Sequence, residues 1–262
     1  MLNVIVDNAT IRRAVGEFAA QPEQRRSIEV LRSCMYGELL FDLTGSDTPV
    51  DGSFPRGSRI QIRGGTGPGG GRALFAFTRQ EEIARLYPPG TETQSMVTPA
   101  AGALELARRQ QDAWLYIDPA GPTCALSAME IDFALRNPNN EPLKTALAAL
   151  DAGHADRRDV LQVLLKEGPI LLGADEKSVA GKVVVRSTVL ADGSSALIGF
   201  TSAPEVVAFN PADAVGALTT LQVLEMVRRD GYSGIVINPA GPSIAFPNGE
   251  IETGKVVSDG GV

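Results

Sequence analysis

The chain contains one nine-residue stretch twice: residues 114–122 read WLYIDPAGP, and residues 234–242 read GIVINPAGP. The two stretches lie 120 positions apart, and each joins an apolar run to an aspartate or asparagine followed by Pro-Ala-Gly-Pro. A repeat at this separation is typical of an internal duplication, in which each copy forms one structural unit. The stretch therefore predicts a molecule built from two similar units.

The duplication extends to the start of each copy, where an asparagine precedes an apolar stripe at helical spacing. Asn8 and Asn140 occupy this place. The matching apolar positions are Ile11, Ala14, Val15 and Phe18 in the first copy and Leu143, Ala146, Leu147 and Leu150 in the second. Apolar residues at i, i+3, i+4 and i+7 indicate an amphipathic helix, and asparagine is a favoured N-cap. Each copy is thus predicted to open with a capped helix.

A glycine-led strand, a hairpin, a second helix and a buried strand follow in both copies. The predicted strands are 37–41, 59–63, 73–78 and 114–117 in the first copy and 168–172, 182–186, 196–201 and 234–237 in the second. A short final strand is predicted at 130–132 and 250–252, because acidic residues there alternate around an isoleucine. Hairpins mixed with helices favour an α+β fold over a doubly wound parallel sheet.

The boundary between the copies is predicted at the turn-rich segment 137–142, which reads NPNNEP. It divides the chain into unit 1–137, unit 138–253 and a small polar tail, 254–262, which we expect to be disordered. Because so short a linker gives little freedom, the units are expected to pack as an intrachain pseudo-dimer.

The repeated turn has the composition of a type I β-turn, with Asx at i, Pro at i+1 and Gly at i+3. The Asx side chain can then accept a backbone N–H two residues on. This favours a rigid corner after a buried strand; the alternative is a corner that presents backbone groups to a ligand or partner. Candidate contact residues for that alternative are Trp114, Asp118, Pro119, Gly121, Pro122, Asn238, Pro239, Gly241 and Pro242.

The two copies differ at the turn, because Asn238 replaces Asp118 and Gly234 replaces Trp114. A site formed by these residues is therefore not expected in two equal copies. For Trp114 we expect burial at the interface between the copies.

Composition excludes several partners. The net charge is −7 and the isoelectric point is about 4.9, so nucleic acid and anionic membrane surfaces are not expected to bind. No apolar run approaches bilayer length. The two cysteines, Cys34 and Cys124, form no metal-binding or disulfide pattern, which fits a reducing cytoplasm.

Three motifs that suggest chemistry are better explained structurally. The glycine-rich segment 64–71 lacks the lysine of a phosphate-binding loop and lies between two predicted strands, so we interpret it as a flexible hairpin tip. His154, the sole histidine, is expected in a solvated loop between helices. The carboxylates of Asp118, Glu130, Asp132, Glu250 and Glu252 could supply an acid–base pair, but the last four are expected on a surface strand. No metal, cofactor or catalytic group is expected.

The order of the matched segments resembles the amino-terminal domain of the SseB family. The similar pieces are Asn8, 37–41, 75–78 and 116–121 in the first copy and Asn140, 168–172, 198–201 and 236–241 in the second. The chain departs from the family pattern in Asp118, where asparagine is usual, and in the glycine-rich insertion after Arg63. Because the family has no established activity or site residues, the resemblance implies a fold and assigns no role to any residue.

The sequence therefore predicts a non-enzymatic intracellular protein-interaction module with an unidentified protein partner, as a monomer with an intrachain pseudo-dimer or as a homodimer. A third possibility is a purely structural or immunity-type partner protein, which differs from the first only in the identity of its partner. The alternative is a small-molecule-binding regulator or an unrecognised enzyme with a cleft between the copies, since ligands favour domain interfaces.

Overall fold

The computed structural model describes residues 6–49, 53–175 and 184–259. The chain divides into two compact units, Met1–Asp132 (unit 1) and Phe133–Val262 (unit 2), and each is described by itself. The division lies inside helix α5, five residues before the boundary predicted from sequence.

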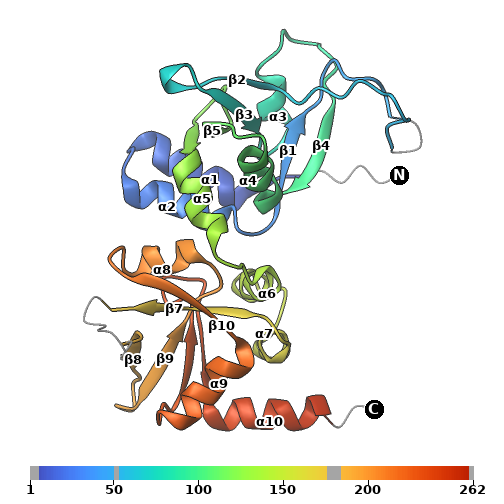
Figure 1. The fold of residues 1–262 in the computed structure, drawn as a ribbon. Coiled ribbons are helices and arrows are strands. Elements are labelled where there is room, and N and C mark those ends of the chain that lie inside the picture. Colours follow the sequence, from blue (N-terminus) through green and yellow to red (C-terminus); the bar gives the residue numbers. More distant parts are fainter. Residues whose placement is uncertain (1–5, 50–52, 176–183, 260–262) are drawn as a thin grey trace. The chain divides into compact units, whose positions relative to one another are not determined.

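The two units contain the same elements in the same order (Figure 1). Those of unit 1 are α1 (Ala9–Ala20), α2 (Gln24–Ser33), β1 (Glu38–Asp42), β2 (Gly64–Thr66), η1 (Pro68–Gly70), β3 (Arg72–Ala76), α3 (Gln80–Ala84), β4 (Ser95–Pro99), α4 (Ala100–Arg109), β5 (Trp114–Ile117), β6 (Cys124–Ser127) and α5 (Ala128–Arg136). Only the one-turn η1 helix, within the glycine-rich segment, has no equivalent among the described residues of unit 2.

Those of unit 2 are α6 (Glu141–Asp151), α7 (Arg157–Leu165), β7 (Pro169–Ala174), β8 (Ser187–Val189), β9 (Ser195–Gly199), α8 (Ala203–Phe209), β10 (Ala214–Thr219), α9 (Thr220–Arg229), β11 (Gly234–Ile237), β12 (Ile244–Pro247) and α10 (Asn248–Asp259). The α+β fold in two tandem copies is confirmed.

Each unit holds a four-stranded mixed sheet and a two-stranded antiparallel pair. In unit 1 the order is β2-β3-β5-β6, with β3 and β5 parallel and the outer strands antiparallel. β1 pairs with β4 and joins the sheet through two hydrogen bonds between Leu40 and Phe77, of 2.8 and 2.9 Å. Unit 2 repeats this as β8-β9-β11-β12 and β7-β10, joined through Leu171 and Phe200.

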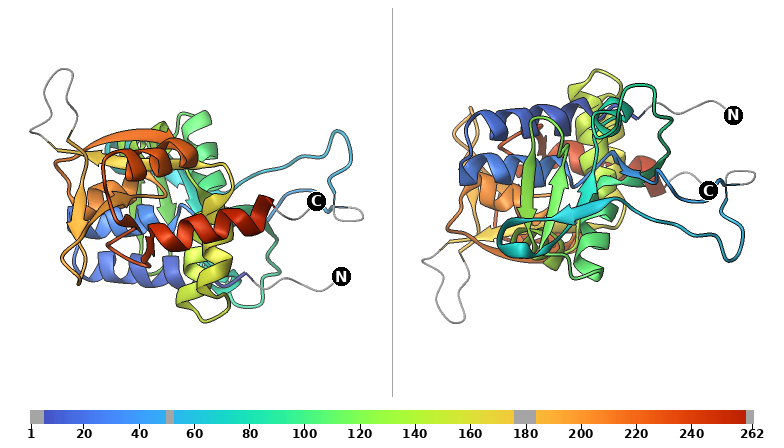
Figure 2. Two further views of the ribbon diagram at one scale, coloured as in Figure 1. Left: turned by 90° about the horizontal axis from the view of Figure 1, so that it is seen from below. Right: turned by 90° about the horizontal axis from the view of Figure 1, so that it is seen from above.

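The predicted first helices are confirmed, together with their caps. The side chains of Ile11, Ala14 and Val15 are buried on α1, and those of Leu143 and Leu147 are buried on α6. α2 lies beside α1, as the paired blue helices in Figure 2 show. The apolar stripe of the opening helix therefore faces the core, as its spacing predicts.

The predicted final strands are wrong. Residues 130–132 lie in α5 and residues 250–252 in α10, while the last strands, β6 and β12, end before them. Ser127 and Glu130 exchange hydrogen bonds at the start of α5, in the pattern of a capping box, with Ser127 N donating to Glu130 Oε2 at 2.8 Å. Glu130 therefore lies at the start of a helix and not in a solvent-exposed strand.

Two further expectations need correction. α10 continues to Asp259, so residues 254–259 are helical and not disordered, while 260–262 lie outside the described residues. Residues 59–63 form no strand, because the hairpin begins at Gly64. In the second copy, 182 and 183 lie outside the described residues and β8 begins at Ser187.

The glycine-rich segment forms a hairpin, as predicted, with an exposed tip at 68–70 and closely packed arms. A Cβ on Gly65 would lie 2.6 Å from the Phe75 ring, and a Cβ on Gly67 would lie 2.4 Å from Trp114 Cδ1. Trp114 Nε1 donates to the carbonyl of Pro68 at 3.3 Å. The glycines thus allow the hairpin to lie directly on these aromatic side chains, and Trp114 is half-buried beneath its own unit's hairpin.

The remaining motifs are structural. His154 is exposed between α6 and α7, as predicted. Cys34 and Cys124 are both buried, neither forms a disulfide within the described part of the chain, and burial raises the pKa of Cys124. Across the described helices, none has the length and apolarity needed to cross a membrane.

Candidate functional site

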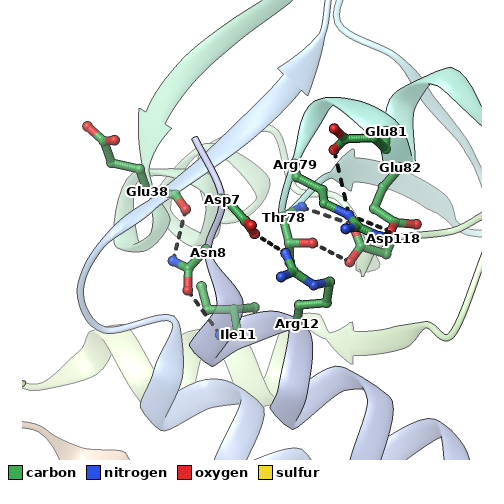
Figure 3. Close-up of polar contacts among 10 residues, drawn as sticks. All are labelled: Asp7, Asn8, Ile11, Arg12, Glu38, Thr78, Arg79, Glu81, Glu82 and Asp118. Carbon is green, nitrogen blue, oxygen red and sulfur yellow. Dashed lines mark hydrogen bonds and ion pairs between the residues drawn. The ribbon is translucent and has the colours of Figure 1, made fainter. Parts of the chain in front are cut away.

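The repeated turn lies where β5 ends in unit 1 and β11 ends in unit 2, beside the end of the parallel neighbour strand. In unit 1 the buried Asp118 carboxylate accepts two hydrogen bonds from Thr78, from its backbone N at 2.9 Å and from its hydroxyl at 2.7 Å (Figure 3). Gly121 N donates to the Asp118 carbonyl at 3.1 Å, which closes the four-residue turn. The corner is therefore bonded to the adjacent strand.

Unit 2 makes the same corner with an amide in place of the carboxylate. Asn238 Oδ1 accepts from Thr201 N at 2.9 Å, and Asn238 Nδ2 donates to Thr201 Oγ1 at 2.8 Å. Gly241 N donates to the Asn238 carbonyl at 2.8 Å. The hydrogen bond to the threonine hydroxyl thus runs in opposite directions in the two units, because a carboxylate only accepts whereas an amide nitrogen donates.

The N-cap asparagine completes this arrangement, which we call the corner network. Its members are Asn8, Thr78 and Asp118 in unit 1 and Asn140, Thr201 and Asn238 in unit 2. Asn8 Oδ1 caps α1 by accepting from Ile11 N at 3.0 Å (Figure 3). Asn8 N donates to the Thr78 carbonyl at 3.0 Å.

The same side chain also reaches the first strand. Asn8 Nδ2 donates to the carbonyl of Glu38 at 3.0 Å, and Asn140 Nδ2 donates to that of Pro169 at 2.9 Å. A Cβ on Gly37 would lie 2.9 Å from Asn8 Nδ2, which explains the glycine that begins the predicted strand. The network therefore joins a helix start, the first strand and the ends of both parallel strands.

Charged residues surround the network in unit 1. The buried Glu82 on α3 accepts from Arg79 Nη2 at 2.9 Å, and Arg85 Nη1 lies 2.7 Å from Glu82 Oε2 in an ion pair without hydrogen-bond geometry. Arg12 on α1 pairs with Asp7 (Figure 3). Two carboxylates, those of Glu82 and Asp118, are thus buried at one end of the sheet.

Unit 2 replaces this cluster with one buried ion pair. Lys144 on α6 pairs with Glu205 on α8, and both side chains are almost fully buried. Lys144 stands in the sequence where Arg12 stands in unit 1, and Glu205 stands where Glu82 stands. The electrostatic environment of the corner therefore differs between the units, although its hydrogen-bonded frame does not.

Burial raises the pKa of Asp118 to about 6, which the two hydrogen bonds from Thr78 only partly offset. Among the smaller contributions to that value, the nearby Glu82 carboxylate raises the pKa and Arg12 lowers it. A carboxyl that titrates near neutrality is a general feature of acid–base sites. Here, however, the Asp118 side chain is 2% exposed and both its oxygens bond to Thr78, so its geometry is that of a structural clamp.

The other sequence-predicted residues lie at the surface of the corner or elsewhere. Ala120 and Ala240 are exposed at the turn tips, and the flanking candidates are half-buried or exposed: Pro119, Gly121, Pro122, Pro239, Gly241 and Pro242. Gly121 packs against Arg85 and Glu82. Trp114 belongs to the hairpin contact at the far end of β5, so it does not join Asp118.

Sequence reasoning missed the polar partners of the corner. Thr78 and Thr201 ended predicted strands without an assigned role, and Glu82, Glu205 and Lys144 were not singled out. A signal for them exists, since Thr78 and Glu82 recur as Thr201 and Glu205 at one common offset. No cluster of three or more His, Cys, Asp or Glu residues suited to a metal ion occurs within 6–49, 53–175 and 184–259.

The family comparison agrees with this duplicated geometry. The model of the SseB protein N-terminal domain matches the chain twice, over residues 11–132 and 143–253. The chain belongs to the SseB family. No curated protein and no solved structure matches it. The two SseB domains coincide with the two units, and the tandem arrangement inferred from the repeated turn is confirmed.

Proposed function

We propose that this SseB-family protein is a non-enzymatic intracellular interaction module whose protein partner binds along an edge strand. The supporting observation is that β4 pairs only with β1, and β10 only with β7, among the described strands. An edge strand offers unpaired backbone N–H and C=O groups to an extended segment of another chain. Both units carry such a strand.

The side chains of β4 suit this role. Val97 is 44% exposed at the centre of the strand, and Met96 and Thr98 beside it are half-buried. An added peptide strand would bury Val97 and pair with the free edge of β4. The corner network supports the non-enzymatic part of the proposal, because the oxygens of Asp118 and the side chain of Asn238 are engaged with Thr78 and Thr201.

The test uses the full chain as bait in its native lysate, with the variant Val97→Lys. Lysine on an edge strand opposes strand addition, so the partner recovered by the wild type is expected to fall to background. Ile60→Lys is the matched control, since Ile60 is 50% exposed and lies outside the strands. The proposal fails if the wild type captures no protein above background, or if Val97→Lys captures the same partner as Ile60→Lys does.

A further inference from the structure

Unit 2 contains an apolar cavity of about 400 Å³ that the proposed function does not use. It lies between the β7–β10 pair and the carboxyl end of α9, with walls that include Leu172, Gly216, Leu218 and Met226. Its volume falls in the usual range of small-molecule sites, roughly 300–1,000 Å³. The cavity lies wholly within unit 2.

A comparison of equivalent residues in the two units explains why this cavity is open in unit 2. In the β7–β10 register Leu172 faces Gly216, whereas in the β1–β4 register the equivalent pair is Phe41 and Met96. Unit 2 thus has two smaller side chains at these positions. A Cβ built on Gly216 meets nothing within 4 Å, so the missing side chain leaves free volume and no close contact depends on the glycine.

The cavity rim carries two opposite charges that neutralise each other. Arg229 Nε donates to Asp230 Oδ1 at 2.7 Å, and Arg229 Nη2 donates to Asp230 Oδ2 at 3.0 Å. A charged ligand entering the apolar walls would lose hydration without gaining an unpaired counter-charge. An uncharged ligand gains from burial of its apolar surface and keeps a polar rim for one hydrogen bond.

We propose that unit 2 binds a small, uncharged, predominantly apolar molecule of aromatic-ring size in this cavity. The site belongs to unit 2 alone, because the residues that replace Gly216 and Leu172 in unit 1 are Met96 and Phe41. The proposal does not rest on strand addition, which the Val97→Lys variant tests on β4 of unit 1.

The experiment uses two probes of matched size, uncharged 1-naphthalenemethanol and anionic 1-naphthoate, with the full chain. The uncharged probe is expected to raise the Tm of the wild type, because it binds the folded state, and to give saturation-transfer NMR signals. The anion is expected to bind about tenfold or more weakly, because its charge must be desolvated.

Gly216→Met introduces into unit 2 the methionine found at the equivalent position of unit 1. It is expected to abolish both the rise in Tm and the saturation-transfer NMR signals. Gly249→Met is the matched control, because Gly249 also has nothing within 4 Å and lies outside the cavity; it is expected to bind like the wild type. Absence of binding to the wild type, or equal binding to Gly216→Met, would overturn the site. Equal or tighter binding of the anion would overturn the ligand class.

Discussion

Asp118 and Asn238 occupy equivalent positions in the two units, but one carries a carboxylate and the other an amide. Both side chains bond the backbone N–H and the hydroxyl of a threonine at the end of the neighbouring strand. Only Asp118 can ionise, and burial raises its pKa from 3.8 to about 6. The carboxylate therefore carries a desolvation cost that the amide of Asn238 does not.

Asp118→Asn is expected to stabilise unit 1 above pH 6. With a pKa raised in the folded state, folded protein binds more protons than unfolded protein between pH 3.8 and about 6, so this residue lowers stability as pH rises through that window. The full effect is on the order of 3 kcal/mol for a shift of about two units. Urea unfolding at pH 4 and pH 8 measures it, with the variant's advantage expected at pH 8.

Asn238→Asp is the matched control, and it is expected to change the free energy of unfolding in the opposite direction. It introduces a buried carboxyl into unit 2, so its free energy of unfolding is expected to fall below that of the wild type as pH rises toward 8. The same advantage of Asp118→Asn at pH 4 and pH 8 would contradict the assignment of the pH dependence to this carboxyl.

Local contacts of single residues were predictable from sequence, whereas distant ones were not. The Asn8 and Asn140 caps rest on a bond to a residue three positions on, which spacing alone specifies. The composition of the turn also gave its closing bond at Gly121. Asp118, in contrast, bonds Thr78, 40 positions earlier, and not the turn N–H that its composition favours. Pairing over that distance depends on strand order.

At the scale of elements, the glycine-rich hairpin makes contacts that its composition alone does not reveal. Many glycines suggest flexibility, yet the missing side chains of Gly65, Gly67 and Gly71 allow the arms of the hairpin to touch Phe75, Ala113 and Trp114. The prediction of final strands at 130–132 and 250–252 failed for another reason. An alternation of three residues, Glu-Ile-Asp, fits one turn of helix as well as a strand, and only the serine before it signals the cap of α5.

Gly67→Ala is expected to lift the hairpin from Trp114. The added methyl group would lie 2.4 Å from the indole ring, an overpacking that costs about 1–3 kcal/mol. Because Trp114 is the sole tryptophan of the chain, its fluorescence reports this contact directly. A red shift of the emission maximum is the expected result, since the ring becomes more exposed to water.

Gly16→Ala is the control for the hairpin substitution. Gly16 lies within α1 with nothing within 4 Å, so alanine there is expected to leave the emission unchanged and to stabilise the helix by about 0.5–1 kcal/mol. If Gly67→Ala emits like Gly16→Ala, the hairpin does not rest on the ring.

At the scale of the whole molecule, the division inside α5 assigns Phe133 to unit 2. Its side chain packs against a cluster on one face of the β7 and β9 strands, formed by Leu171, Ile198, Phe200, Ala203 and Val206. The sequence placed the boundary at the turn-rich segment after residue 137, because turn composition marks a break in secondary structure and not where packing changes. The packing of the two units as a pseudo-dimer stays a prediction.

A fragment 133–262 is expected to be more stable than a fragment 138–262. The shorter fragment loses Phe133 from its core cluster, which costs about 1–2 kcal/mol for a partly buried aromatic ring and lowers the Tm by several degrees. Calorimetry measures both. Phe133→Ala in the longer fragment is expected to reproduce the loss; equal Tm values for all three would place the boundary at 137.

The corner network also affects how two similar domains avoid mispairing with each other during synthesis. Asp118, the last member of the first network, is synthesised 120 residues before Asn238, the last member of the second. Domains fold in order of synthesis, and mispairing between neighbours is a characteristic failure of repeated domains. Unit 1 can therefore close its own helix start and strand ends before the second network is complete. The charge difference between Arg12 with Asp7 and the buried Lys144–Glu205 pair makes a later exchange between copies costly.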